Sequence, residues 1–216
     1  MLTDVKGLIE RSTRMRRMSL ASIYHAESGH PGGVLSAIDL VNYLLCEKSI
    51  LKEDFKFILS KGHAAPAIYS AAIENNWVDK SELKKLRKLG SIFQGHPSVI
   101  ETPWAETSTG SLGQGFSVSI GMAMGFKHQQ KSTRVYVMIG DGELQEGEIW
   151  EGAMCAAHYK LNNLTAIIDR NRLQSIEDTE TTLMLEPLEK KLLSFNWAVK
   201  VVDGHNHKEL SNSLNY

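Results

Sequence analysis

A short apolar run that ends in a glycine-framed aspartate constrains this chain more than any other stretch. Residues 135–139 are β-branched, aromatic or long apolar residues in a run too short for a helix, which is typical of a strand buried on both faces of a parallel sheet. Gly140, Asp141 and Gly142 follow, and an acidic, helix-compatible segment begins near Gln145. We expect the glycines to allow positive φ and close approach of a ligand, and the free amides of the helix to favour an anion. Asp141 would then lie at the carboxyl end of the strand.

A second strand pattern ends in polar residues of its own. Residues 164–169 read as a buried strand that runs into Asn171 and Leu173. Asn171 follows Asp141 by 30 positions (171 − 141), which leaves room for a helix over 145–159 and predicts one right-handed βαβ unit. Open α/β sheets bind ligands at the carboxyl ends of their strands. The side-chain oxygens of Asp141 and Asn171, with a backbone carbonyl near Leu173, are hard ligands suited to a magnesium ion that bridges a diphosphate.

Length and composition bound the fold and its partners. At 216 residues, without repeat, low-complexity tract or linker, the chain is expected to form one α/β domain over 1–216. Its 24 lysines and arginines balance 25 acidic residues, so no net field indicates nucleic acid or a membrane surface. No signal-peptide pattern is present, and no apolar run approaches the ~18 residues that span a bilayer, so we expect a cytoplasmic protein. Cys46 and Cys155 are expected to be free thiols.

The remaining pattern alternates helices, strands and loops. The helices expected from periodicity and small residues cover 2–24, 36–46, about 66–74, 116–128, 186–195 and a segment after 206. Further strands are expected at 57–60 and 197–202, and a polar loop at 174–182. Ser81 is the expected N-cap of a short helix with a solvated basic face. The arginines of the first helix, 11, 14, 16 and 17, are expected to form a solvated or interface face, with phosphate binding as the alternative.

Three histidines each follow a glycine in a loop. They are His30, His63 and His96, and the glycine lets each backbone come near a ligand. Taken alone, His30 reads as a surface loop histidine. A glycine-rich turn over 106–115 precedes the helix at 116–128, whose small residues predict close helix packing, either inside the domain or across a subunit boundary.

The pair formed by Gly140-Asp141-Gly142 and Asn171 resembles the magnesium-diphosphate signature of thiamine diphosphate enzymes. Further motifs extend the resemblance to the transketolase family along essentially the whole chain. In chain order they are Ser28-Gly29-His30-Pro31-Gly32, Ser60-Lys61-Gly62-His63, Gly95-His96-Pro97, Thr109-Gly110-Ser111-Leu112-Gly113-Gln114-Gly115 and Asp203-Gly204-His205. They match the N-terminal, pyrophosphate-binding half, and the chain is similar to the short N-terminal subunits of split transketolases. The resemblance implies a doubly wound, mostly parallel sheet with helices on both faces.

The resemblance also assigns cofactor contacts. Asp141, Asn171 and the Leu173 carbonyl would bind magnesium, while Gly142 and His63 would contact the diphosphate of thiamine diphosphate. The cofactor site would therefore draw on both strand ends and on a loop histidine.

Other positions would contact the ring system, the sugar or a neighbouring subunit. Gly110 and Leu112 would meet the aminopyrimidine through their backbone, and Glu146, which matches an acid near the subunit interface, is also expected to be a cofactor-binding residue. His30 and His96, with His63, would surround the thiazolium and the hydroxyls of the donor sugar, where imidazoles can relay protons near neutral pH. His205 is interpreted as a structural turn or cap residue.

The implied activity is transfer of a two-carbon glycolaldehyde unit from a ketose phosphate to an aldose phosphate, with thiamine diphosphate and Mg²⁺ as cofactors. In the family, the acid that activates the aminopyrimidine belongs to the other half. We therefore expect a heteromer of two copies of this chain with two C-terminal, pyrimidine-binding subunits.

Two departures from the family pattern accompany this expectation. Ser111 stands where many transketolases have proline, and the family's further strand and histidine loop do not follow Asp203-Gly204-His205. We expect a domain that lacks its C-terminal end. Two alternatives stay open, a related reaction on a sulfosugar or another specialised sugar, and a noncatalytic protein for cofactor binding or assembly.

Overall fold

A computed structural model gives the structure of residues 4–48, 54–175 and 177–214. These residues form two compact units. The helical unit comprises the described residues of 1–53, 62–108 and 201–216, and the sheet unit comprises those of 54–61 and 109–200. The predicted histidines belong to the helical unit, and the predicted metal ligands belong to the sheet unit. That the whole of 1–216 acts as one domain stays a prediction.

Three parallel strands form the main sheet, in the order β1–β2–β3. They are β1 (Phe55–Leu59), β2 (Arg134–Gly140) and β3 (Leu164–Asp169). The central strand β2 is buried from its second residue to its last, which accounts for its unbroken apolar run. Gly140 pairs with Asp169 in the parallel register, so the residues that follow β2 and β3 leave the sheet at the same edge. The predicted α/β class and parallel pairing are confirmed.

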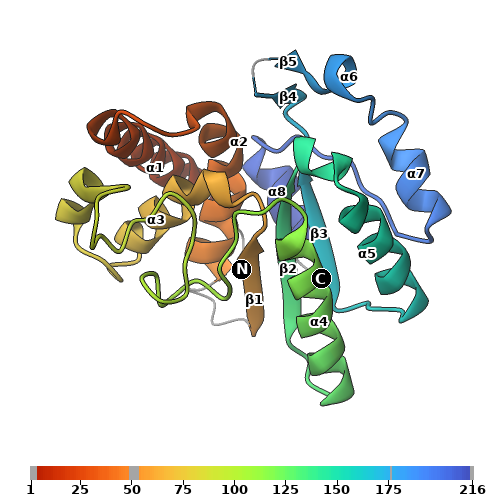
Figure 1. Ribbon diagram of the computed structural model, residues 1–216. Coiled ribbons are helices and arrows are strands. Elements are labelled where there is room, and N and C mark those ends of the chain that lie inside the picture. The colour runs from red at the N-terminus through yellow and green to blue at the C-terminus, as the bar shows by residue number, and fades with distance from the viewer. Residues whose placement is uncertain (1–3, 49–53, 176, 215–216) are drawn as a thin grey trace. The chain divides into compact units, whose positions relative to one another are not determined.

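Helices α4 (Gln114–His128) and α5 (Gly147–His158) lie side by side against β2 and β3 (Figure 1). Helix α5 and the 3₁₀ turn Gly142–Gln145 before it connect β2 to β3, which confirms the predicted βαβ connection. Close packing explains the small residues. A Cβ on Gly152 would lie 2.9 Å from side-chain atoms of Ile120 and Phe116. The shared core of this layer includes Phe116, Ile120, Val135, Val137, Ile139, Ile149 and Ala153.

The rest of the sheet unit corrects two expectations. Residues 174–182 are not one loop, because β4 (Leu173–Gln174) and β5 (Glu177–Asp178) form an antiparallel pair and α6 (Thr179–Thr182) follows. Helix α7 (Leu188–Ser194) confirms the helix expected at 186–195. The strand expected at 197–202 is wrong. Its first residue, Trp197, instead donates its indole N–H to the Ala153 carbonyl of α5 at 2.9 Å.

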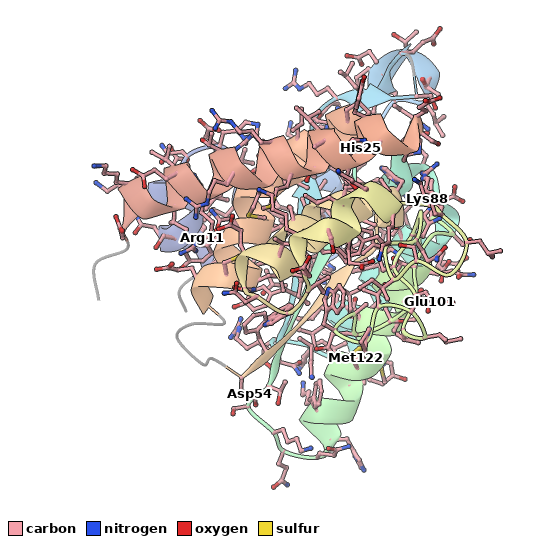
Figure 2. The ribbon with its side chains drawn as sticks, turned by 90° about the vertical axis from the view of Figure 1, so that its left-hand side faces the viewer. Arg11, His25, Asp54, Lys88, Glu101 and Met122 are labelled. Atoms are coloured by element: carbon pink, nitrogen blue, oxygen red, sulfur yellow. The ribbon has the colours of Figure 1, made fainter. Side chains whose placement is uncertain are left out.

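The helical unit is built around α1 (Val5–Ala26), which runs alongside α3 (Ala65–Glu74); Figure 2 marks Arg11 and His25 along α1. Its other elements are α2 (Pro31–Val41), the π-helical segment Asn42–Lys48, the 3₁₀ turns Gly62–Ala64 and Lys80–Lys85, and α8 (His207–Leu214). Tyr69 and Phe93 stack at 4.4 Å between ring centroids in its core. None of the helices in the described residues is both long and apolar enough to span a membrane.

Local chemistry corrects three expectations here. Helix α2 begins at Pro31 rather than residue 36, because proline is favoured in the first helical turn. The N-cap near residue 81 is Asp79, whose carboxylate accepts the Ser81 N–H at 2.8 Å. The arginines of α1 are not a purely solvated face, because Arg14 pairs with Glu74 and Arg16 with Asp39.

Candidate cofactor and metal site

Asp141 is fixed at the end of β2 by hydrogen bonds to both carboxylate oxygens. The residue is only 2% exposed. Oδ1 accepts the Gly142 N–H at 2.9 Å, and Oδ2 accepts the Arg172 N–H at 2.6 Å and an N–H of Arg170 at 3.1 Å. Because burial of an unpaired carboxylate is costly, these three donors explain why the acid can remain buried.

The other two predicted ligands follow β3 in the same turn. The amide oxygen of Asn171 accepts the Leu173 N–H at 2.9 Å. Arg172, the residue between them, is the one whose N–H reaches Asp141. The structure therefore brings Asp141, Asn171 and Leu173 together at one end of the sheet, as the two strand patterns predict. We call these three residues the strand-end set; their binding of a metal stays a prediction.

Sequence reasoning missed Glu143, which fixes the surroundings of this set. Its Oε1 accepts the Gly113 N–H at 2.8 Å and the Ser60 hydroxyl, and its Oε2 accepts the Gly140 N–H at 3.0 Å. Burial raises the pKa of Glu143, and the three hydrogen bonds oppose that rise. The Glu143 side chain bonds the backbone N–H of Gly140, three residues earlier, which is the spacing of a capping box. This spacing can be read from the sequence, so the role of Glu143 was predictable in part.

Glu143 also holds the glycine-rich loop that contains Gly110 and Leu112. Gly113 has φ +90°, and a Cβ on Gly115 would lie 2.7 Å from the Ser60 Cα. A side chain at position 115 would push the loop away from Ser60, which follows β1, and a side chain at position 113 would be strained by the positive φ. The loop backbone is thus held in a fixed course, and the aminopyrimidine contacts of Gly110 and Leu112 stay a prediction.

The surroundings of Gly142 fit a hydrated cation. Gly140 and Gly142 are not among the positive-φ glycines of the described residues, so neither position uses the positive φ that glycine allows, while close approach of a ligand stays a prediction. Gly142 is instead small because a Cβ would lie 3.1 Å from the Gln174 side chain. Within the described residues, the buried Oε1 of Gln174 has no hydrogen-bond partner. A cation-bound water is a hydrogen-bond donor, and Mg²⁺ usually keeps several waters, so the donor set fits magnesium.

The donor types suit a hard cation such as Mg²⁺ or Mn²⁺. In the described part of the chain, no three His, Cys, Asp or Glu side chains come together in a way that could hold a metal ion. One carboxylate, one amide and one carbonyl form an all-oxygen set, which suits a hard cation that also binds a diphosphate.

The three predicted histidines belong to the helical unit. His30 precedes the first residue of α2, and His63 lies in the turn before α3. Their ring centroids are 5.3 Å apart in an edge-to-face arrangement. Partial burial and the charges of Arg87 and His30 lower the pKa of His96, which favours a neutral imidazole near pH 7. The structure thus brings His30 and His63 together and links His96 to His30 electrostatically.

Two further predicted positions have different surroundings. His205 contacts Asp39, with 2.7 Å between Nδ1 and Oδ2, in the turn before α8. This contact supports its structural interpretation. Glu146 is exposed at the start of α5 and makes no capping hydrogen bond with its side chain; its contact with another subunit stays a prediction.

Comparison with known proteins identifies the class of protein to which this chain belongs. A family model described as "Transketolase, thiamine diphosphate binding domain" matches residues 10–216. The chain belongs to the transketolase family and corresponds to its thiamine diphosphate-binding domain. This confirms the resemblance found in the sequence.

Both full-length enzymes and shorter subunits are similar to the chain. It is 37% identical to the transketolase of Pongo abelii over 95% of this chain but only 34% of that protein. It is 37% identical to an apulose-4-phosphate transketolase subunit of Phocaeicola vulgatus, covering 96% of this chain and 76% of that protein. A 6-deoxy-6-sulfo-D-fructose transketolase subunit of a Clostridium species is 35% identical, covering 93% and 75%. The chain thus spans about a third of the full-length relative.

The fold agrees with a solved transketolase. The crystal structure of transketolase from Campylobacter jejuni superimposes with a TM-score of 0.89 and 30% identity, over 98% of this chain and 35% of that one. The predicted fold class is therefore confirmed by structure as well as by sequence.

Proposed function

We propose that this chain is the N-terminal subunit of a two-chain transketolase that depends on thiamine diphosphate and Mg²⁺. The enzyme would transfer a glycolaldehyde unit from a ketose phosphate to an aldose phosphate. The observation that carries the proposal is the position of Asp141, whose carboxylate binds the amide between Asn171 and Leu173. This arrangement supports the proposal, because the residues that would supply three oxygen ligands follow the carboxyl ends of neighbouring parallel strands, where such folds bind ligands.

The residues of the chain would divide the work. Asp141 and Asn171 would hold the cation with the Leu173 carbonyl, and Glu143 would keep the loop of Gly110 and Leu112 in place. Bound thiamine diphosphate would supply the carbanion chemistry that the transfer requires. His30 and His96 would bind the donor sugar and move protons at its hydroxyls, since a neutral imidazole can accept and return a proton near pH 7.

The need for a partner is supported by the relatives and by the surface of the sheet unit. Two relatives of similar identity are named as subunits of transketolases. Val118 on α4 and Met154 on α5 are large, exposed apolar side chains, and exposed apolar surface often marks an interface. A C-terminal, pyrimidine-binding subunit would supply the acid that activates the aminopyrimidine, in a complex of two copies of each chain.

A partner-dependent assay tests the proposal. The purified chain is mixed with xylulose 5-phosphate, ribose 5-phosphate, Mg²⁺ and thiamine diphosphate, with and without the candidate partner. We expect turnover only when the partner is present, because the activating acid is supplied by that subunit. Substantial turnover by this chain alone would contradict the two-chain proposal.

The identity of the sugar is a separate question. The named sulfo-sugar and apulose enzymes are about as similar to this chain as the full-length transketolase is. A reaction on a specialised sugar is therefore the second candidate. Running the same assay with a 6-deoxy-6-sulfoketose and with an apulose phosphate as donor separates the candidates by their relative kcat/KM. Cofactor binding without turnover on any donor would favour the noncatalytic alternative.

A further inference from the structure

Arg170 joins the Asp141 carboxylate to a distant part of the sheet unit. It follows the last residue of β3, and its side chain is only 18% exposed. Nη1 donates to Asp141 Oδ2 at 3.1 Å and to the Thr179 hydroxyl at 2.6 Å. Nη2 donates to Glu180 Oε1 at 2.8 Å and to Glu186 Oε1 at 3.2 Å. One guanidinium thus bonds the predicted metal ligand on one side and three side chains of 179–186 on the other.

The two acids on the far side are themselves held by the backbone. Glu180 accepts the N–H groups of Leu185 and Glu186, both at 3.2 Å. Glu186 accepts the Leu188 N–H at 2.9 Å, at the first residue of α7. The acceptors of Arg170 are therefore parts of a fixed framework, which we call the 179–188 support.

The lone pairs of Asp141 leave room for both Arg170 and a cation. An ionised carboxylate offers about four acceptor sites. Arg170 and the Arg172 N–H take two on Oδ2, and the Gly142 N–H takes one on Oδ1. One acceptor site remains, on Oδ1. A cation can therefore bind Asp141 while the arginine contact is retained, and that contact fixes the direction of the remaining lone pair.

Nearby carboxylates offset the positive charge of Arg170. Its guanidinium faces Glu180 and Glu186 as well as Asp141. In addition to Asp141, the predicted metal ligand, Glu180 and Glu186 screen the positive charge of Arg170. This screening reduces the repulsion between Arg170 and a cation at Asp141. We therefore expect the main effect of Arg170 on the site to be the orientation of the carboxylate.

We propose that Arg170 is a positioning residue for the cation site, and that it transmits the geometry of the 179–188 support to Asp141. The inference rests on the proposed role of Asp141 in magnesium binding. It predicts that cation affinity depends on residues of the support that touch no ligand. Loss of a group that orients a metal ligand typically lowers affinity by about 10–100-fold.

The test compares four variants of the full chain, in complex with its partner where the partner is needed for cofactor binding. Arg170→Gln removes the bridge, Arg170→Lys keeps only a point charge, and Glu180→Gln weakens the support. Lys160→Gln is the matched control, because it removes the same charge from an exposed position in the turn after α5, away from the strand-end set. Affinity for Mn²⁺ in the presence of thiamine diphosphate is measured by electron paramagnetic resonance.

We expect Arg170→Gln to lose about 10–100-fold in Mn²⁺ affinity and Arg170→Lys and Glu180→Gln to lose less, in the same direction. Lys160→Gln should change affinity by less than about threefold, as for an exposed charge. Tighter binding by Arg170→Gln would show a competing charge and overturn the proposal. Equal changes in Arg170→Gln and Lys160→Gln, or none in either, would also overturn it.

A second measurement separates this inference from the proposed function. Hydrogen exchange is followed in the chain without cation or cofactor, at the amides of Arg172, Leu185 and Leu188. Arg170→Gln should speed exchange at all three, because the bridge that holds both ends is gone; Lys160→Gln should not. Unchanged exchange would refute the link even if the wild type binds Mn²⁺. Failure of the wild type to bind Mn²⁺ with thiamine diphosphate would refute the magnesium site, and the exchange data would still decide the link.

Discussion

The sheet unit and the helical unit hold their predicted site residues in opposite ways. In the sheet unit, Asp141 and Glu143 are almost fully buried, and each accepts hydrogen bonds from three groups. In the helical unit, His30 is exposed and makes no capping bond to α2, and His96 is also exposed. A group that binds a cation needs fixed geometry, whereas a group that exchanges protons with a sugar needs access. This difference agrees with the proposal that the sheet unit holds the cation and that His30 and His96 serve the substrate.

The largest effect should come from removing the Asp141 carboxylate. Asp141→Ala should abolish magnesium-dependent binding of thiamine diphosphate, because it removes a charged metal ligand. Titration calorimetry with and without Mg²⁺ measures this. The structure adds that the change also leaves Arg170 without one partner of a buried ion pair, so some stability is lost.

Two further variants control for that loss. Asp141→Asn keeps the shape of the side chain and should still bind cofactor poorly, because the amide carries no charge. Glu151→Ala, at an exposed acid on α5, should bind like the wild type. Wild-type affinity in Asp141→Asn would remove Asp141 from the metal site and break the contrast between the two units.

The next effect concerns the histidines. Alanine at His30 or His96 should lower kcat by about 10²–10⁴, the usual range for a lost proton-transfer group, while thiamine diphosphate affinity changes less. His63→Ala should weaken cofactor binding as well. Steady-state kinetics of the assembled enzyme measure both quantities. His158→Ala, an exposed histidine on α5, is the control, and unchanged rates in all three variants would make them ordinary loop histidines.

The smallest expected effect concerns Asp39, a buried acid of the helical unit that can be compared with the buried acids of the sheet unit. Burial alone would raise the pKa of Asp39, but hydrogen bonds from Arg16, Ser12 and His205 lower it to about 2. A lowered folded-state pKa stabilises the fold above the unfolded value near 3.8, and this stability is lost as the pH falls through about 2. The shift corresponds to about 2 kcal/mol at neutral pH.

Urea unfolding of the wild type and of Asp39→Asn at pH 7 and pH 2 measures this contribution. The two proteins should differ by about 2 kcal/mol at pH 7 and by less at pH 2. A difference that does not depend on pH would show that the ion pair with Arg16 is not its source. Glu143 offers the contrast, because its hydrogen bonds come from uncharged groups and burial raises its pKa.

The sequence predicted the features that depend on neighbours along one strand or helix. The buried run of β2, the polar ends of β2 and β3 and the helix between them follow from periodicity and length alone, and they place Asp141 beside the turn of Asn171. The amphipathic and small-residue helices are predictable for the same reason. Each of these patterns reports burial, which a strand or helix imposes at regular intervals.

Features that depend on distant partners were missed or misread. Glu143 meets Ser60, and Arg170 meets Glu180, only because the fold brings separate segments together. The apolar stretch from Trp197 looked like a strand, but its first side chain binds α5 instead of extending the sheet. The sequence suggests that position 142 needs glycine for backbone freedom, whereas in the structure the Gln174 side chain leaves little room for a Cβ there. Tertiary contacts of this kind leave no periodic trace.

The most direct test of the account is to locate the cation. A crystal of the chain with thiamine diphosphate, Mn²⁺ and its partner subunit, measured at the manganese absorption edge, gives an anomalous peak wherever the cation binds. We predict one peak within about 2.2 Å of the Asp141 carboxylate, also coordinated by the Asn171 side-chain oxygen and the Leu173 carbonyl. Ordered thiamine diphosphate with the cation bound elsewhere, or with no cation at Asp141, would contradict the account.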